Sequence, residues 1–169
     1  MATSRRRDAR AGPGVDPGDA RAARSAALDA LARRDRSAGE LRRKLVDKGF
    51  TSGIAAQVID RLCGEKLVDD RRYVEKFVSF HATRGHGPLR IRADLRTAGV
   101  DDELVDLAVE AYPDWLEQVR RAHQKKFGIR PPADYADQQR RARFLRVRGF
   151  TGGHIRMALG FDTDLDVDA

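Results

Sequence analysis

A run of arginines near the end of the chain is the strongest chemical signal in this sequence. Residues 138–160 include six arginines and no acidic residue. If this segment is helical, Arg140, Arg143 and Arg146 recur at three-residue steps and share one side of the helix. A stripe of fixed cations can hold the phosphates of a nucleic acid, and it also suits an acidic protein groove.

A second basic cluster surrounds the compact segment Arg84-Gly85-His86-Gly87-Pro88. The end of one helix followed at once by the start of another accounts for its glycines and its proline. That turn does not account for the gathering of Arg84, Arg90 and Arg92 around it. This junction is therefore a second candidate contact region.

Catalytic chemistry is poorly represented. The four histidines form no HxxxH or HxH pair, and the nucleotide-binding and nucleophile motifs GxxxxGK[ST], GxGxxG and GxSxG do not occur. His81 is expected to pack on a Tyr73–Phe77 stripe, and Asp69-Asp70 to cap a helix rather than hold a cation. The single cysteine, Cys63, excludes an internal disulfide and is expected to pack. We expect a binding protein without enzymatic activity, cofactor or metal.

Composition supports a basic binding protein. The chain carries 41% hydrophobic and 35% charged residues, with a net charge of +7. Such a charge favours an anionic partner, although the surface of a protein from an arginine-rich proteome would look the same. No apolar run approaches the ~20 residues that span a bilayer, and no signal-peptide pattern is present. We expect a cytoplasmic protein without a membrane segment.

The chain repeats itself at a spacing of fifty residues. Segments 45–50, 95–100 and 145–150 align, each with glycine at its fifth position. Helix-capping residues follow in register at Thr51, Asp101 and Thr151. A fixed period of this length indicates a tandem array of one small structural unit, which offers an extended surface more readily than a closed pocket.

Apolar spacing within the repeats predicts helices and no strands. A capping box at Ser37 and Glu40 starts one helix, Gly49 ends it, and Pro88 suits a first helical position. We expect an all-α fold of three tandem three-helix repeats in an elongated, curved array, with the third repeat truncated. The expected divisions are a disordered basic arm (1–19), a leader helix (20–36), repeat 1 (37–86), repeat 2 (87–136), partial repeat 3 (137–160) and an acidic tail (161–169).

In order along the chain, these features resemble the RecX family of RecA regulators. The matching stretches are ALDALARR (27–34), SAGELRRKLVDKGF (37–50), LVDDRRYVEKFVSFHATRGHGPLRIRADLRTAGV (67–100) and the weaker RRARFLRVRGFTGGHIRMAL (140–159). The most specific piece is the block from Asp-Asp-Arg-Arg-Tyr to Gly-His-Gly-Pro-Leu-Arg-Ile. The resemblance covers about residues 27–160.

The resemblance implies a curved helical module that lies in the groove of the RecA–DNA filament. It implies inhibition of strand exchange, ATP hydrolysis and co-protease activity, with no catalysis by the module itself. The expected partner is the RecA nucleoprotein filament, with possible direct contact to single- or double-stranded DNA, and the protein is expected to act as a monomer. The candidate filament or DNA contacts are Arg71, Arg72, Arg84, Arg90, Arg92, Arg140, Arg143 and Arg146.

Other interpretations fit the same residues. A plain DNA-binding helical module would use its basic stripes on phosphates and would not need RecA. A scaffold for another acidic protein is a third possibility. At the level of single residues, Arg72 could form an ion pair with Asp69 instead of contacting the filament or DNA.

Four features depart from the family pattern. His81 stands where an arginine is expected, and Ala98 replaces a basic residue before Gly99. The glycine-rich arm and the tail with Asp162, Asp164, Asp166 and Asp168 have no counterpart in the pattern. We hypothesise that the tail competes with polyanions for the arginine stripe. The simpler interpretation, which we favour, is a disordered solubilising extension.

Overall fold

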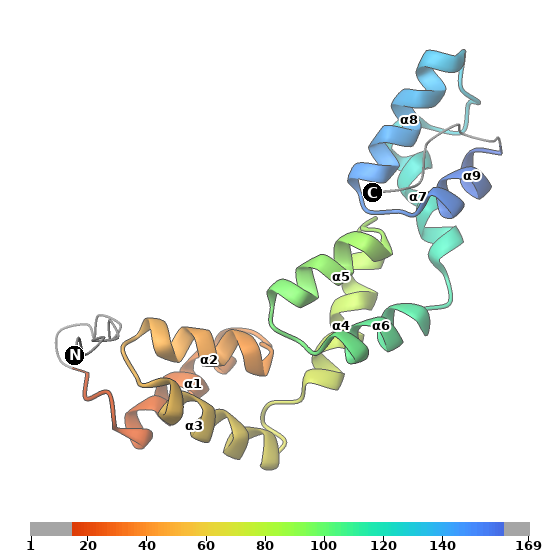
Figure 1. Cartoon of the computed structure of the whole chain (residues 1–169). Coiled ribbons are helices and arrows are strands. Elements are labelled where there is room, and N and C mark those ends of the chain that lie inside the picture. The colour runs from red at the N-terminus through yellow and green to blue at the C-terminus, as the bar shows by residue number, and fades with distance from the viewer. Residues whose placement is uncertain (1–14, 161–169) are drawn as a thin grey trace, which may run out of the picture. The chain divides into compact units, whose positions relative to one another are not determined.

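The computed structural model describes residues 15–160 of the 169-residue chain. Most of the expected basic arm and the whole acidic tail lie outside these residues. Within the described part all regular structure is helical, which confirms the all-α prediction. The helices are α1 (Ala20–Arg33), α2 (Ala38–Asp47), α3 (Ser52–Gly64), α4 (Asp70–Thr83), α5 (Pro88–Thr97), α6 (Asp102–Glu110), α7 (Trp115–Phe127), α8 (Tyr135–Val147) and α9 (Gly152–Leu159) (Figure 1).

The described residues divide into two compact units. Unit 1 comprises residues 15–73 and 98–100, and unit 2 comprises residues 74–97 and 101–160. Helix α4 begins in unit 1 and continues in unit 2, so the boundary falls inside a helix. No helix between residues 15 and 160 is long and apolar enough to cross a lipid bilayer.

Helices begin at the capping residues that the sequence predicts. The Ser37 hydroxyl accepts a hydrogen bond from the Glu40 N–H at 3.0 Å, and Thr51 and Thr151 cap α3 and α9 in the same way at 3.2 Å. The Asp101 carboxylate accepts bonds from two backbone N–H groups at the start of α6. Each side chain satisfies donors that the first helical turn cannot pair internally.

The glycines of the fifty-residue repeat lie directly after helices, in the left-handed region. Gly49, Gly99 and Gly149 have φ angles of 103°, 74° and 86°, a region that costs other residues energy because of their Cβ atom. This confirms the prediction that Gly49 ends its helix in the left-handed conformation. The periodic glycines therefore allow the chain to turn sharply between two helices without backbone strain.

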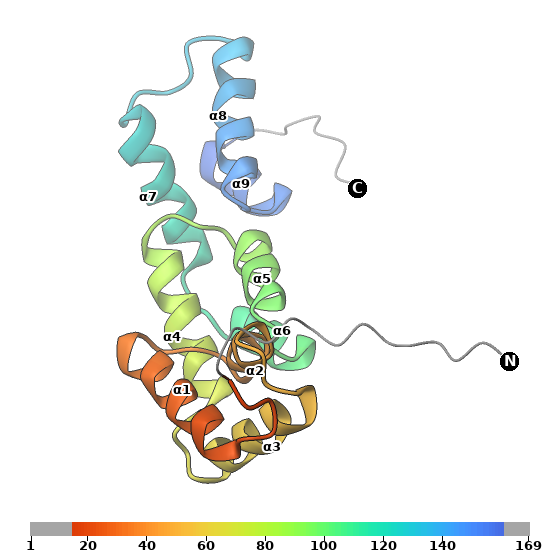
Figure 2. The ribbon, with the colours of Figure 1, turned by 90° about the vertical axis from the view of Figure 1, so that its left-hand side faces the viewer.

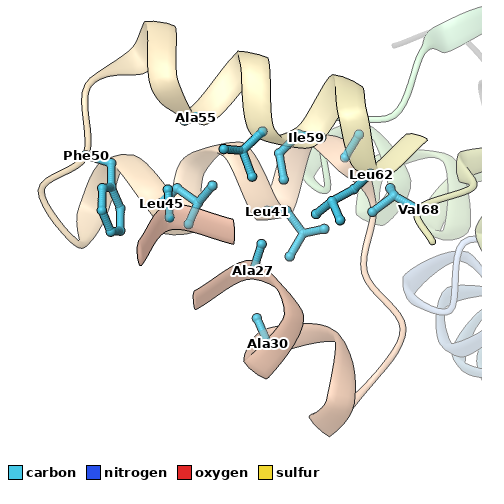
Figure 3. Packing of buried hydrophobic residues seen from close by; sticks show 12 residues of the cluster. Ala27, Ala30, Leu41, Leu45, Phe50, Ala55, Ile59, Leu62 and Val68 are labelled. Carbon is cyan, nitrogen blue, oxygen red and sulfur yellow. The ribbon is translucent and has the colours of Figure 1, made fainter. Parts of the chain in front are cut away.

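The core of unit 1 lies between its first three helices. Leu41 and Leu45 of α2 meet Ile59 and Leu62 of α3, and all four are at most 1% exposed. Alanines of α1 face the same cluster, and Figure 3 shows Ala27 pointing into it. Burying such side chains stabilises the unit by roughly 1.5–3 kcal/mol each. Because alanine is small, α1 can approach the leucines closely.

Unit 2 has its own apolar centre. Helices α7, α8 and α9 contact one another, and Leu145, Phe150 and Ile155 are buried there. The indole N–H of Trp115 donates to the carbonyl of Val109 at 2.9 Å and so joins the start of α7 to the end of α6. In Figure 2, α8 and α9 lie side by side, with α7 leading toward them.

A hydrogen bond to a backbone carbonyl beside a periodic glycine occurs twice, fifty residues apart. In unit 1 the Ser37 hydroxyl donates to the carbonyl of Ala98 at 2.6 Å, next to Gly99. In unit 2 the N–H of Gly87 donates to the carbonyl of Arg148 at 2.7 Å, next to Gly149. In each case the start of one helix packs on the glycine turn of a later helix pair. The fifty-residue period of the sequence thus corresponds to a packing contact that repeats at the same spacing.

Candidate functional site

Two predicted contact residues, Arg71 and Arg72, lie exposed in the first turn of α4, in unit 1. The backbone N–H of Arg72, rather than its guanidinium, donates to the Asp69 carboxylate at 3.0 Å. Asp69 therefore caps α4, as the sequence predicts. Asp70 accepts a bond from the Ala38 N–H at 2.8 Å and so caps α2 instead, and burial raises the pKa of its carboxyl group.

Arg90 and Arg92 are both on α5 but differ in their partners. The Arg92 guanidinium lies 2.8 Å from Asp106 and 3.7 Å from Glu110, and its side chain is 22% exposed. It therefore joins α5 to α6 inside unit 2. Arg90 is more open, with a looser contact of 3.7 Å to Asp94. Of the two, Arg90 is better placed to reach a partner.

The arginines of α8 separate into bound and open side chains. Arg140 donates two hydrogen bonds to Asp137 on the same helix. Arg143 and Arg146 are exposed, and within residues 15–160 neither forms an ion pair or side-chain hydrogen bond. The stripe that the sequence predicts is thus reduced to two open cations beside one paired cation.

Arg141 belongs to the same arginine run but has a structural role. It is 6% exposed, and it donates to Asp137 and to the carbonyls of Arg130 and Pro131. The hydrogen bond from Arg141, and to a smaller extent that from Arg140, lowers the pKa of the Asp137 carboxyl group to about 2. The four-residue spacing of Asp137 and Arg141 is the sequence signal that marks this pair.

Arg84 lies in a basic cavity of unit 2 that sequence reasoning did not identify. Its guanidinium stacks on Phe80, 4.1 Å from the ring centre. The cavity measures about 240 Å³, and besides Arg84 it is lined by four further cationic side chains, Arg121, Lys125, Lys126 and Arg148. No short-range pattern could reveal it, because these residues come from three separate segments of the chain.

His81 and His86 form a stacked pair at the junction between α4 and α5. Their Nδ1 atoms lie 3.1 Å apart, so one ring donates and the other accepts. The His81 ring also lies 4.1 Å from that of Phe77, which confirms the predicted aromatic packing. Burial lowers the pKa of both imidazoles, and the nearby Arg90 acts in the same direction.

Within the described residues, no group of three or more histidine, cysteine or acidic side chains could hold a metal ion. The expected packing of Cys63 is wrong, because this side chain is exposed near the end of α3. Its neighbour Leu62 faces the core instead, since successive residues of a helix point in different directions.

The helices, turns and open arginines together define an all-helical protein built from tandem three-helix domains with basic surfaces. Family models described as the first, second and third three-helix domains of RecX match residues 23–62, 69–109 and 113–159. The chain belongs to the RecX family of regulatory proteins, as the sequence resemblance predicts. In the division that the family models give, the third domain covers residues 113–159 and contains the three helices α7, α8 and α9.

Individual relatives agree with the family models. The regulatory protein RecX of Acidithiobacillus ferrooxidans is 43% identical over 143 residues, covering 85% of this chain and 92% of its own. That of Halorhodospira halophila is 42% identical over 138 residues, covering 81% and 86%. The crystal structure of RecX from Lactobacillus salivarius has the same fold, with a TM-score of 0.71 at 22% identity over 83% of this chain and 94% of that one.

Proposed function

We propose that this protein binds the RecA nucleoprotein filament and lowers its recombinase, ATPase and co-protease activities, without catalysing a reaction itself. Membership of a family of regulatory proteins supports a regulatory role. The observation that carries the proposal further is the pair of open cations, Arg143 and Arg146, on an exposed face of α8. Cations without an internal partner are available to the acidic groups of a filament.

The eight predicted contact residues differ in how available they are. Arg143 and Arg146 come first, because neither has an internal ion pair in the described chain. Arg84 and Arg90 are next in availability. Arg84 stacks on an aromatic ring, and Arg90 has only a loose ion pair. Arg71 and Arg72 offer a further contact from unit 1. Arg92 and Arg140 would first have to release their carboxylate partners.

Several weak contacts suit this mode of binding. A monomer that touches more than one RecA protomer gains effective concentration with each added contact. Bound in the filament groove, it would block the approach of duplex DNA and hinder the relative motion of neighbouring protomers. We place this activity in the cytoplasm.

The test is RecA ATP hydrolysis on single-stranded DNA, titrated with this protein below one molecule per RecA. Inhibition at such ratios is the expected result, because one bound molecule affects several protomers. Inhibition only after the protein coats the DNA would favour the alternative, a DNA-binding module that does not need RecA. Such a module would also bind bare DNA as tightly as RecA-coated DNA, with a salt slope of about −0.9 per phosphate contact.

Charge reversal identifies the contact surface. The double variant Arg143→Glu/Arg146→Glu should require roughly tenfold more protein for half inhibition, because two attractive contacts become repulsive. The matched control is Arg21→Glu/Arg33→Glu, which makes the same change in net charge on exposed positions of α1. If both variants weaken inhibition equally, net charge rather than the α8 surface governs binding.

A further inference from the structure

The basic cavity of unit 2 has the chemistry of a specific anion site. It is formed by the end of α4, one side of α7 and the end of α8. Five of its lining residues are cationic, and no carboxylate lines it. We propose that this cavity binds a phosphate group. The proposal concerns unit 2 alone and does not depend on the function proposed above.

Two of the cations are held in place with their donors unused. The guanidinium of Arg84 lies 4.1 Å from the centre of the Phe80 ring, and that of Arg148 lies 5.0 Å from the centre of the Phe144 ring. An aromatic ring supports the flat face of a guanidinium and leaves the N–H groups at its edge free to donate. Neither guanidinium donates to an acceptor within residues 15–160. Fixed donors of this kind match the oxygens of a phosphate.

The positive charge of the cavity exceeds what its surroundings neutralise. Glu117 is paired with Arg121 at 2.8 Å, which leaves four cations without a carboxylate partner in the described chain. Three helices end near the cavity, and each C-terminus carries roughly half a negative charge. Even if all three faced inward, roughly two and a half positive charges would remain. Interaction with the helix C-termini therefore does not account for all the cationic side chains of the cavity.

Gly85 explains why the cations can meet here. Its φ angle is 81°, and a Cβ atom at this position would lie 3.3 Å from the Ala122 Cβ and 3.8 Å from Nη1 of Arg148. A glycine is therefore what allows the end of α4 to turn beside α7 and to bring Arg84 close to Arg148. The Arg-Gly pair that stands out in the sequence thus forms one wall of the cavity.

The size of the cavity limits the ligand to a small group. Pockets for drug-sized molecules measure about 300–1,000 Å³, and this cavity, at about 240 Å³, is smaller. It suits a phosphate or a pyrophosphate, with any attached sugar and base remaining outside. Such a group could come from the backbone of a DNA strand or from a free nucleotide or polyphosphate.

Isothermal titration calorimetry of the full-length protein with inorganic pyrophosphate tests the proposal. We expect saturable binding to one site and affinity at least about tenfold weaker in the double variant Lys125→Ala/Lys126→Ala, because charge-assisted contacts are lost. Both lysines are exposed, so their removal should leave the fold intact. The fluorescence of Trp115, the single tryptophan, verifies that unit 2 is folded.

The matched control is Lys44→Ala/Lys48→Ala, which removes two lysines from the end of a helix in unit 1. This variant should bind pyrophosphate as the unmodified protein does. An equal loss in both variants, or no saturable binding to the unmodified protein, would overturn the proposal. So would tighter binding of an oligoglutamate peptide than of pyrophosphate, because it would assign the cavity to an acidic protein segment.

Competition distinguishes the two sources of phosphate. A fluorescent oligothymidylate is bound first and pyrophosphate is then added. Displacement that is lost in Lys125→Ala/Lys126→Ala supports the cavity as a site for a phosphate of the DNA backbone. Simultaneous binding of both ligands supports a site for a free phosphate compound, separate from the DNA contacts.

Discussion

At the scale of single residues, neighbouring arginines of one helix have different roles. Arg141 is buried and bonded to Asp137 and two carbonyls, whereas Arg143, two positions later, is exposed. The difference follows from helix geometry, because a step of two residues rotates the side chain to the other side of α8. A buried guanidinium must be fully paired to be tolerated, whereas an exposed one remains available to a partner.

The ion pair of Asp137 gives a prediction for acid stability. Because the pKa of Asp137 is lowered from 3.8 to about 2 in the folded protein, its contribution is present at neutral pH and is lost as the pH falls through this range. Asp137→Asn should therefore lower the urea midpoint of unit 2 at neutral pH, because Arg141 loses its counterion. The difference from the unmodified protein should disappear toward pH 2. A constant difference at all pH values would contradict this account.

At the scale of elements, the two recurring turn contacts depend on close approach of backbones. A Cβ atom on Gly39 would lie 2.5 Å from the carbonyl oxygen of Gly99, and one on Gly87 would lie 2.2 Å from the carbonyl carbon of Gly149. Both distances are to backbone atoms, which cannot rotate away. Each contact thus needs a glycine in the turn and another near the start of the helix that packs on it.

Adding a methyl group at these positions tests the packing of the repeats. Gly39→Ala and Gly87→Ala should each destabilise the protein by about 1–3 kcal/mol, the usual cost of overpacking. Urea unfolding measures the effect, followed by circular dichroism for Gly39→Ala and by Trp115 fluorescence for Gly87→Ala.

The control is Gly53→Ala on α3, where an added Cβ meets nothing within 4 Å. This variant should be neutral or slightly more stable, because alanine favours a helix over glycine. Unchanged midpoints in both Gly39→Ala and Gly87→Ala would mean that the turn contacts contribute little to stability.

At the scale of the whole molecule, the histidines are distributed unevenly between the two units. All four, His81, His86, His123 and His154, belong to unit 2, and burial lowers the pKa of each. The buried Nδ1 atom of His154 has no hydrogen-bond partner within the described residues. Residues 15–73 and 98–100, which make up unit 1, include no histidine.

This distribution predicts that mild acid destabilises unit 2 selectively. Unfolded histidines titrate near pH 6.5 and the folded ones at lower pH, so the unfolded chain binds more protons below about pH 6.5. The stabilisation of unit 2 by its neutral histidines is therefore fully present above about pH 6.5, and it decreases as the pH falls below this value. Urea unfolding followed by Trp115 should show a lower midpoint at about pH 5.5 than at about pH 7.5.

Hydrogen exchange in α2 and α3 supplies the internal control, because these helices of unit 1 should be protected almost equally at both pH values. A midpoint for unit 2 that stays constant or rises on acidification would contradict the prediction. His81→Gln/His86→Gln should reduce the pH dependence if the stacked pair is a principal contributor.

Much of the fold follows from local sequence. Ser37, Thr51 and Thr151 act as helix caps and Gly49 as a helix end because capping and left-handed turns depend on a few consecutive residues. The fifty-residue period likewise indicates a tandem helical array. Helical spacing also places Arg143 and Arg146 on one side of α8, but it does not show that Arg140, on the same side, is paired with Asp137.

The pairing of charges and the cavity were decided only by the tertiary structure. Arg92 bonds Asp106 across two helices, and Arg84 lines the same cavity as Arg148 although sixty-four positions separate them. Contacts of this kind depend on how helices pack, and a pattern of residue types within one helix does not contain that information. The sequence by itself thus determined the helices, their turns and the family, whereas packing determined which cations are bound internally and which remain available to a partner.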